Sequence, residues 1–289
     1  MTRVLEEAAM DRMLIGVDGS PAAHDVLEWS ADLAGRAHLD AVAARVFVPT
    51  QAELPPGEDV LLHDEQLREL DEWCGTLPVG TKRPRTILVD GSPPDALLAA
   101  AAEQHADVLA VGARGSGGFS HLHLGSVAHH LTHHTTLPLA IVPRTGSAPV
   151  KHLVVGVDGS PGSLAAVEIC ADLAARLGVS VTAVYAFDPL VEWVPENDPR
   201  SWHIRAEADV GRWAAPIEKA GVMREIVVDR DIHPVAAIAR ALDAHPGSVA
   251  VLGARGLGGF TGLRLGRVPL QLVHHTGAAV ILVPPAPSE

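Results

Sequence analysis

The sequence predicts an α/β fold made of two tandem, doubly wound parallel-sheet domains. The stretch MLIGVDGSPAAHDVLEWSADLA is answered later in the chain by HLVVGVDGSPGSLAAVEICADLA, and the hexapeptide GVDGSP is identical in both. Gly16 corresponds to Gly156 and, almost a whole unit later, Gly112 corresponds to Gly253, so the offset drifts by a single residue. Within each copy, runs that are apolar on both faces alternate with helical patterns, which indicates a parallel sheet covered on both sides.

Each copy opens with an apolar strand, MLIGV or HLVVGV, followed by the turn DGSP. A helix comes next, because small and apolar residues recur at three- and four-residue spacing. Ser20 and Ser160 suit the N-cap of this helix, since their hydroxyls can accept an N–H bond. Pro21 and Pro161 suit its first turn, where no amide partner is lost.

The remaining elements follow in the same order in both copies. A second β-branched strand (AVAARVFV; VSVTAVYAF) leads through a polar segment to helices around 63–74 and 202–219. The third and fourth strands are TILVD and DVLAVGA in copy one, and EIVVD and SVAVLGA in copy two. A helix and a last strand, LPLAIVP or AAVILVP, close each copy. The segment RTGSAPVK has a linker composition, so we place the domains at 1–145 and 151–286.

Composition excludes several classes of partner. The formal charge of −13 leaves no basic stripe for a nucleic-acid backbone and disfavours an anionic membrane surface. Cys74 and Cys170 lie in different halves within helical sequence, which indicates neither a disulfide framework nor a CxxC metal pair. The first residues, MTRVLEEAAMDR, lack the apolar stretch of a signal peptide, so we expect a cytoplasmic protein.

Asp18 directly follows the first strand. In doubly wound sheets a ligand lies beyond the carboxyl ends of the strands, where the strand order reverses. A carboxylate at such a strand end can accept hydrogen bonds from sugar hydroxyls or from the amino group of a base. The alternative interpretation is an ordinary turn aspartate before Gly19.

A glycine-rich loop follows the fourth strand. It reads Gly112-Ala-Arg-Gly115, nine residues, and then Gly125-Ser126 before a helix that continues with Val127. Glycines let the backbone approach a polyanion, and the first amides of the helix together with a serine hydroxyl can bind phosphate oxygens. A merely flexible loop would not explain glycine at both flanks. The Walker A and GxGxxG patterns are absent, and neither loop contains a lysine.

The spacing G-x2-G-x9-G-[ST], with an aspartate after the first strand, resembles the ATP-binding class of universal stress proteins, and the duplication resembles their tandem two-domain form. The resemblance covers nearly the whole chain. It implies Rossmann-like, adenine-nucleotide α-hydrolase-like domains, ATP with Mg²⁺ as ligand, an internal pseudo-dimer formed through the final strands, and a homodimer of chains. Asp18 and the backbone of Val46 would hold ribose and adenine, and the glycine loop would hold the triphosphate. The implied nucleotide-binding residues of copy one are Gly16, Val17, Asp18, Val46, Val111, Gly112, Arg114, Gly115, Gly125, Ser126 and Val127.

Copy two departs from this pattern at its glycine loop. The matching residues are Asp158, Ala186, Gly253, Arg255, Gly256, Gly266, Arg267 and Val268. Arg267 replaces the serine, and Pro269, which has no N–H to offer, stands where copy one has Ala128. Arg267 is either a cationic phosphate ligand or a structural ion-pair partner in an empty site. We hypothesise that copy one binds ATP more tightly than copy two.

Neither loop presents an obvious general base, a nucleophile with a partner or a carboxylate cluster, so we assign no catalytic residue. This favours a nucleotide-dependent regulatory protein of the stress response without fast catalysis. The alternatives are a slow ATP hydrolase or nucleotidyl-transfer enzyme and, for copy two, a structural dimerisation module with an empty site. The motif AHHLTHH places histidines at i, i+4, a spacing that can chelate a metal. No third ligand lies nearby in sequence, so we interpret the motif as a helix end and assign no metal site.

Overall fold

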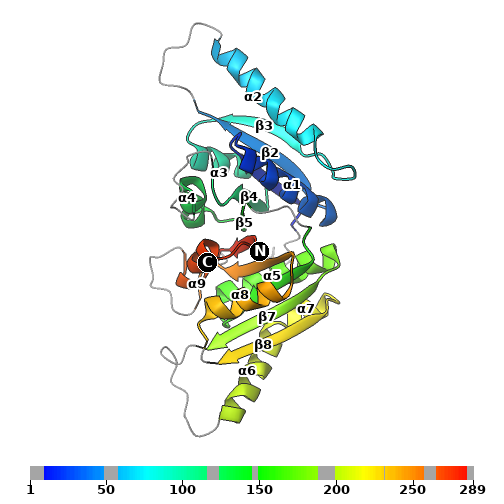
Figure 1. The fold of residues 1–289 in the computed structure, drawn as a ribbon, viewed down its shortest axis with the longest axis vertical. Helices are drawn as coiled ribbons and strands as arrows, with labels where there is room; N and C mark the ends of the chain where they lie inside the picture. Colours follow the sequence, from blue (N-terminus) through cyan, green and yellow to red (C-terminus); the bar gives the residue numbers. More distant parts are fainter. Residues whose placement is uncertain are drawn as a thin grey trace, which may run out of the picture.

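The computed structural model describes residues 10–48, 58–115, 124–144, 149–187, 199–230, 232–256 and 265–284. These residues form one ten-stranded sheet with the order β3-β2-β1-β4-β5-β10-β9-β6-β7-β8 (Figure 1). The strands are β1 (Arg12–Val17), β2 (Asp40–Phe47), β3 (Arg85–Asp90), β4 (Val108–Gly112), β5 (Leu139–Val142), β6 (His152–Gly156), β7 (Ser180–Phe187), β8 (Arg224–Arg230), β9 (Ser248–Gly253) and β10 (Val280–Val283). The helices are α1 (Pro21–Arg36), α2 (Glu58–Gly75), α3 (Pro93–Glu103), α4 (Ser126–His134), α5 (Pro161–Leu177), α6 (Pro199–Trp213), α7 (Ala215–Lys219), α8 (Pro234–Ala244) and α9 (Arg267–His275).

The strand order confirms the predicted doubly wound topology in each half. Domain one runs β3-β2-β1-β4-β5, and domain two repeats this order as β8-β7-β6-β9-β10. Every neighbouring pair within a domain is parallel. The chain moves outward from β1 to β2 and β3 and then returns to β4 on the other side of β1, so the order reverses between β1 and β4.

Helices cover both faces of the sheet, as the two-faced apolar strands predict. Along β1, Met13 and Ile15 pack into one hydrophobic cluster and Leu14 into the other, because successive side chains of a strand point to opposite faces. The first cluster contains residues of α1, α2, α5, α6 and α7, and the second contains residues of α3, α4, α8 and α9. Both clusters include residues of the two domains, so the core continues from one domain into the other.

The final strands of the two domains join the halves. β5 and β10 pair antiparallel, with Ala140 opposite Ile281, and this pairing is the predicted internal pseudo-dimer. We call this boundary between the domains, where β5 pairs with β10, the seam. A second contact crosses the seam on one face of the sheet: the Arg176 guanidinium of α5 donates to the carbonyl of Ala37, at the end of α1, at 3.3 Å. Among the described residues, none of the helices has the length and apolar character needed to span a bilayer.

The helix starts agree with the sequence at the DGSP turns. The Ser20 hydroxyl accepts the N–H of Ala23 at 3.3 Å, and the Ser160 hydroxyl accepts that of Ser163 at 3.2 Å. Each serine is followed by its proline in the first helical turn. The single helix expected around 202–219 is wrong, since α6 ends at Trp213 and α7 starts at Ala215. Pro216 lacks an N–H for the preceding turn, which ends the first helix there.

Candidate functional site

The two predicted motifs of domain one meet where the strand order reverses. β1 and β4 are hydrogen-bonded neighbours with Gly16 opposite Val111, so Asp18 and the segment Gly112 to Gly115 leave the sheet side by side. β2 is the other neighbour of β1, with Val17 opposite Arg45, and Val46 therefore lies at the same edge. The topology thus gathers residues that are far apart in the sequence at the position where such folds bind ligands.

The side chain of Asp18 spans the gap between the motifs. A Cβ on Gly115 would lie only 2.5 Å from Asp18 Oδ2, so this carboxylate oxygen lies against the backbone of the loop. The other oxygen, Oδ1, accepts the N–H of Ser20 at 3.1 Å and its hydroxyl at 2.7 Å. Both interpretations of Asp18 are therefore compatible, because one oxygen holds the turn while the other faces the glycine loop.

The two flanks of the glycine loop close on each other. The N–H of Gly125 donates to the carbonyl of Ala113 at 2.7 Å, and the N–H of Ala113 donates to Val142 on β5 at 2.8 Å. A Cβ on Gly125 would lie 3.4 Å from both the Ala113 carbonyl oxygen and the Arg114 Cα, which is close to ordinary van der Waals contact, so the fold itself does not require glycine here. Residues 116–123, which form most of the loop between these flanks, lie outside the described residues.

Helix α4 begins directly at this closure. Its N-cap is Gly125, which provides no capping side chain, whereas α1 is capped by Ser20. Ser126 is exposed at the first helical position, and Val127 follows it half-buried. A helix N-terminus without a side-chain cap presents backbone N–H groups and a positive dipole end, a combination that favours a bound anion.

Three of the predicted residues are explained by packing. A Cβ on Gly16 would meet the Leu97 side chain of α3 at 2.9 Å, so this glycine allows α3 to lie close to β1. Val17 and Val111 are only 5% and 3% exposed, and their side chains belong to the core. These residues can offer a ligand their backbone only.

One residue of the site was missed by the sequence analysis. The Arg45 guanidinium from β2 lies against the DGSP turn, since a Cβ on Gly19 would come within 2.6 Å of its Nη2. Arg45 also donates to the Glu69 carboxylate of α2 at 2.5 Å. The available signal was a lone charge within an otherwise apolar strand, AVAARVF. Arg45 places a positive charge beside the turn that carries Asp18.

Domain two repeats the skeleton of this site. The Asp158 carboxylate lies against the backbone of Gly256, as Asp18 does against Gly115. The N–H of Gly266 donates to the Ala254 carbonyl at 2.7 Å, which closes the loop in the same way. Residues 257–264 of this loop lie outside the described part of the chain.

The remaining predicted residues of domain two lie at matching positions. Arg267 is exposed at the first position of α9, and Val268 follows it half-buried. Ala186 lies on β7 opposite Asp229, where domain one has Val46 opposite Val89.

The first turn of α5 fills the space beside the domain-two loop. A Cβ on Gly162 would lie 2.5 Å from the carbonyl oxygen of Arg255, and one on Gly253 would lie 2.5 Å from the carbonyl carbon of Gly162. The Ser160 hydroxyl also donates to the Arg255 carbonyl at 3.4 Å. Helix and loop are thus in direct backbone contact. In domain one the matching residue is Ala22, whose Cβ prevents this approach.

Aromatic side chains cover the DGSP turn of domain two. A Cβ on Gly159 would lie 2.5 Å from the Trp213 indole of α6. The rings of Tyr185 and Trp213 are arranged edge to face, with their centroids 5.8 Å apart. Tyr185 stands where domain one has Arg45. The two domains therefore share a backbone scaffold but differ in what surrounds it, a charged pair in domain one and two aromatic rings in domain two.

The histidines of α4 lie in pairs along the helix. The Nδ1 atoms of His133 and His134 are hydrogen-bonded to the backbone carbonyls of His129 and His130, at 2.9 and 2.8 Å. The rings of His130 and His134 are stacked with centroids 3.9 Å apart. Over the described ranges, no group of three or more histidine, cysteine or acidic side chains is arranged to hold a metal ion.

Comparison with known proteins matches both halves of the chain to one family. The model of the universal stress protein family matches residues 10–143 and 149–284. Universal stress protein Rv1996 of Mycobacterium tuberculosis is 28% identical over 311 residues, covering 93% of this chain and 94% of that protein. Universal stress protein Rv2623 of the same organism is 28% identical over 278 residues, covering 89% of this chain and 90% of that protein.

A solved structure supports the fold over the same length. The crystal structure of a universal stress protein from Archaeoglobus fulgidus DSM 4304 aligns with a TM-score of 0.71 and 18% identity, covering 95% of this chain and 98% of that chain. At this identity the likeness concerns the fold alone. The family model, which matches both halves, shows that the chain belongs to the universal stress protein family, as a tandem of two of its domains.

Proposed function

We propose that domain one binds ATP, with Mg²⁺, and that the protein is a nucleotide-dependent regulator of the stress response without fast catalysis. The observation that carries the proposal is the meeting of Asp18, Gly115 and the start of α4 where the strand order reverses. A carboxylate for sugar hydroxyls lies there beside a helix N-terminus for phosphate. A dinucleotide site of the GxGxxG type would need a different spacing, which this chain lacks.

The proposed contacts divide the nucleotide between two strand ends. Asp18 and the backbone of Val46 hold the ribose and adenine. Gly112, Gly115 and Gly125 let the backbone approach the triphosphate, while Ser126 and Val127 offer the amides at the start of α4. Mg²⁺ held by the phosphates would neutralise part of their charge, while the residues named above bind and orient the nucleotide. Gly16, Val17 and Val111 contribute through backbone geometry.

For domain two we propose a structural role with no nucleotide. The backbone contact between Gly162 and Arg255 occupies the space between helix and loop, and Trp213 covers the turn at Gly159. Pro269 also removes one of the N–H groups at the start of α9. Together these features support one nucleotide per chain, with domain two serving as the internal partner of domain one through β5 and β10.

The chemistry of the site favours binding over catalysis. One carboxylate oxygen of Asp18 already accepts hydrogen bonds from Ser20, and Arg45 forms an ion pair with Glu69. Neither arrangement is that of a general base poised on a water molecule. The alternative, a slow ATP hydrolase or nucleotidyl-transfer enzyme, is tested by steady-state turnover with and without magnesium. Turnover of about 1 per second or faster would contradict a pure binding role.

The matched variants Gly125→Asp and Gly266→Asp test which domain binds. Both glycines are N-caps with nearly the same backbone angles, φ −71° and ψ 161° for Gly125 and φ −73° and ψ 162° for Gly266. Aspartate is a favourable N-cap, so both variants should fold. Its charge would repel phosphate at α4. Calorimetry should show ATP binding abolished by Gly125→Asp and unchanged by Gly266→Asp, whereas equal effects would contradict the proposal.

A further inference from the structure

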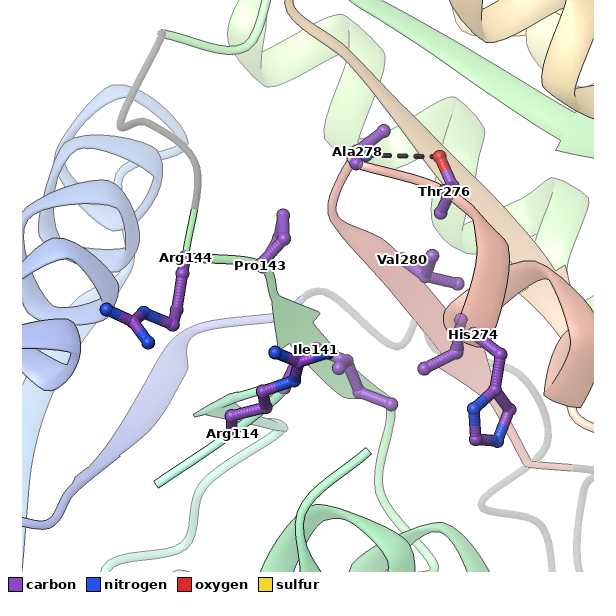
Figure 2. A pocket seen from close by; sticks show the side chains of 11 residues that line it. Arg114, Ile141, Pro143, Arg144, His274, Thr276, Ala278 and Val280 are labelled. Carbon is purple, nitrogen blue, oxygen red and sulfur yellow. Dashed lines mark hydrogen bonds between the residues drawn. The ribbon is translucent and has the colours of Figure 1, made fainter. Parts of the chain in front are cut away.

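A cavity of about 200 Å³ lies at the seam between the domains, beside the candidate site of domain one. Domain one contributes Ala113 and Arg114 from the glycine loop and Ile141 from β5, while domain two contributes His274 and Thr276 from the end of α9. Figure 2 shows Arg114 running alongside Ile141 toward the seam, with His274 and Thr276 on the opposite side. Arg114 therefore lies between the loop at Gly115 and this cavity.

The lining of the cavity suits an anion. Its ionisable side chains are Arg114, Arg144 and His274, and no acidic residue is among the described residues that line it, although the whole chain carries a formal charge of −13. Arg114 is half-buried, whereas Arg144 is exposed at the rim and directed outward in Figure 2. The Thr276 hydroxyl accepts the N–H of Ala278 at 3.1 Å and still has its own hydrogen to donate.

The cavity exists because the turn before β10 is built from small residues. Domain two has Thr276-Gly277-Ala278 there, and the matching turn before β5 in domain one is Thr135-Thr136-Leu137. Both turns keep the same hydrogen bond, from Ala278 N–H to the Thr276 hydroxyl at 3.1 Å and from Leu137 N–H to the Thr135 hydroxyl at 3.0 Å. The backbone of the turn does not require glycine and alanine, since threonine and leucine form it equally well.

This difference between the turns matches the difference between the two loops. The small residues of domain two face the loop of domain one, which keeps Ser126. The larger residues of domain one stand in the matching turn. Because the two domains repeat the same strand order on either side of the antiparallel β5–β10 pair, this turn corresponds to the one that would face the domain-two loop, where Arg267 replaces the serine. Arg144 is likewise matched by Pro285. The space left by small residues and the additional cation Arg144 are thus found together beside the intact loop.

We propose that this cavity is a phosphate-binding subsite that domain two adds to the nucleotide site of domain one. The subsite takes a phosphate group, either the end of the nucleotide's own phosphate chain or a separate inorganic phosphate or pyrophosphate. Arg114 and the Thr276 hydroxyl bind it directly, and Arg144 contributes charge from the rim. The first source rests on the proposed function, since it requires a nucleotide in domain one. The seam between the domains then responds to the number of phosphates on that nucleotide.

The test fills the cavity by replacing the small residues of the domain-two turn with the larger residues of the matching domain-one turn. The double variant Gly277→Thr/Ala278→Leu copies the domain-one turn into domain two, and Thr136→Gly/Leu137→Ala makes the reverse change as the control. ATP, AMP and pyrophosphate are titrated by calorimetry into the full chain and both variants, with melting temperatures to show that each is folded. Loss of a charge-assisted hydrogen bond should weaken binding about tenfold.

The three ligands separate the outcomes. If the subsite binds the end of the nucleotide's own phosphate chain, filling the cavity weakens ATP binding about tenfold and leaves AMP binding unchanged. If it takes a separate phosphate, the wild-type chain binds pyrophosphate and the filled variant does not, while ATP and AMP are unaffected. Unchanged binding of all three ligands, equal weakening of ATP and AMP, or no binding of any ligand to the wild-type chain would overturn the inference. A wild-type chain that binds pyrophosphate but no nucleotide would defeat the proposed function alone.

Discussion

The carboxylate of Asp18 lies against the backbone of Gly115, in the space that any side chain at that residue would need. A Cβ there would be 2.5 Å from Asp18 Oδ2, although the two residues belong to different strand ends. Domain two contains the same contact between Asp158 and Gly256. The pair is therefore part of the shared scaffold, and we propose that the neighbouring residues decide which copy binds a ligand.

Gly115→Ala should displace the Asp18 carboxylate and weaken ATP binding at least about tenfold, because a carboxylate that accepts sugar hydroxyls provides on the order of 1.5–3 kcal/mol. Gly115 is exposed, so the melting temperature should change little. Gly256→Ala is the matched control and should leave ATP affinity unchanged. Calorimetric titration of both variants checks this, and similar losses in the two would mean that domain two also binds nucleotide.

Exchanging the loop motifs should have unequal effects. Ser126→Arg/Ala128→Pro gives α4 the first three residues of α9, removing the hydroxyl and one N–H, and should reduce ATP affinity by about tenfold or more. The reverse exchange, Arg267→Ser/Pro269→Ala, should not create a second site, because the backbone contact of Gly162 with Arg255 remains. Calorimetric stoichiometry distinguishes these results. A second bound nucleotide in the reverse variant would show that the motif alone decides binding.

Acid should destabilise the protein through His152, which is 6% exposed. Its ring nitrogens are hydrogen-bonded to the hydroxyls of Ser180 and Thr182, both at 2.8 Å, its ring is stacked on His245, and Glu225 lies nearby. Burial, reinforced by the charge of His245 and opposed by Glu225, lowers the pKa of His152 to about 4.

A depressed histidine pKa favours the neutral form in the folded state. Stability is therefore lost as pH falls through the unfolded pKa of about 6.5 toward the folded value. Between pH 7 and pH 5 this group should cost about 2 kcal/mol of the free energy of unfolding, measured by urea denaturation. Over that pH range the His152→Gln variant should lose less free energy of unfolding than the wild-type chain. The control His38→Asn, at an exposed residue, should lose as much as the wild type. Parallel curves for His152→Gln and the wild type would contradict this assignment.

The seam between β5 and β10 should couple the unfolding of the two domains. Ile281 is 3% exposed, lies opposite Ala140 and belongs to a core cluster that both domains share. Ile281→Asp buries a carboxylate without a partner and should cost about 3 kcal/mol or more, whereas Ile281→Val should cost about 1 kcal/mol. The wild-type chain should unfold in one transition by both tryptophan fluorescence and circular dichroism. Two separate wild-type transitions would show that the domains are independent.

The sequence was sufficient for the doubly wound parallel sheet of each domain and for placing Asp18 and the glycine loop at strand ends. Apolar runs define the strands, and the rule for strand ends in parallel sheets brings together motifs that are distant in the sequence. The break between α6 and α7 also had a signal in the sequence, namely Pro216. That signal did not outweigh a helical pattern that continues on both sides of it.

The close contact between α5 and the domain-two loop could not be predicted in this way. It depends on how closely α5 approaches β9, which Gly162 permits but does not by itself reveal. The place of Arg45 depends on the register between β1 and β2, which no local pattern defines. The seam cavity depends on β5 pairing with β10, so the small residues at Gly277 and Ala278 have no visible meaning within their own domain.

The number of nucleotides bound per chain tests the central claim most directly. Nucleotide retained through purification, identified by mass spectrometry, should be ATP, and calorimetry of the emptied full chain should give one ATP site that Gly125→Asp abolishes. Two sites per chain, no site, or one site that survives Gly125→Asp and is lost in Gly266→Asp would contradict the assignment of nucleotide binding to domain one.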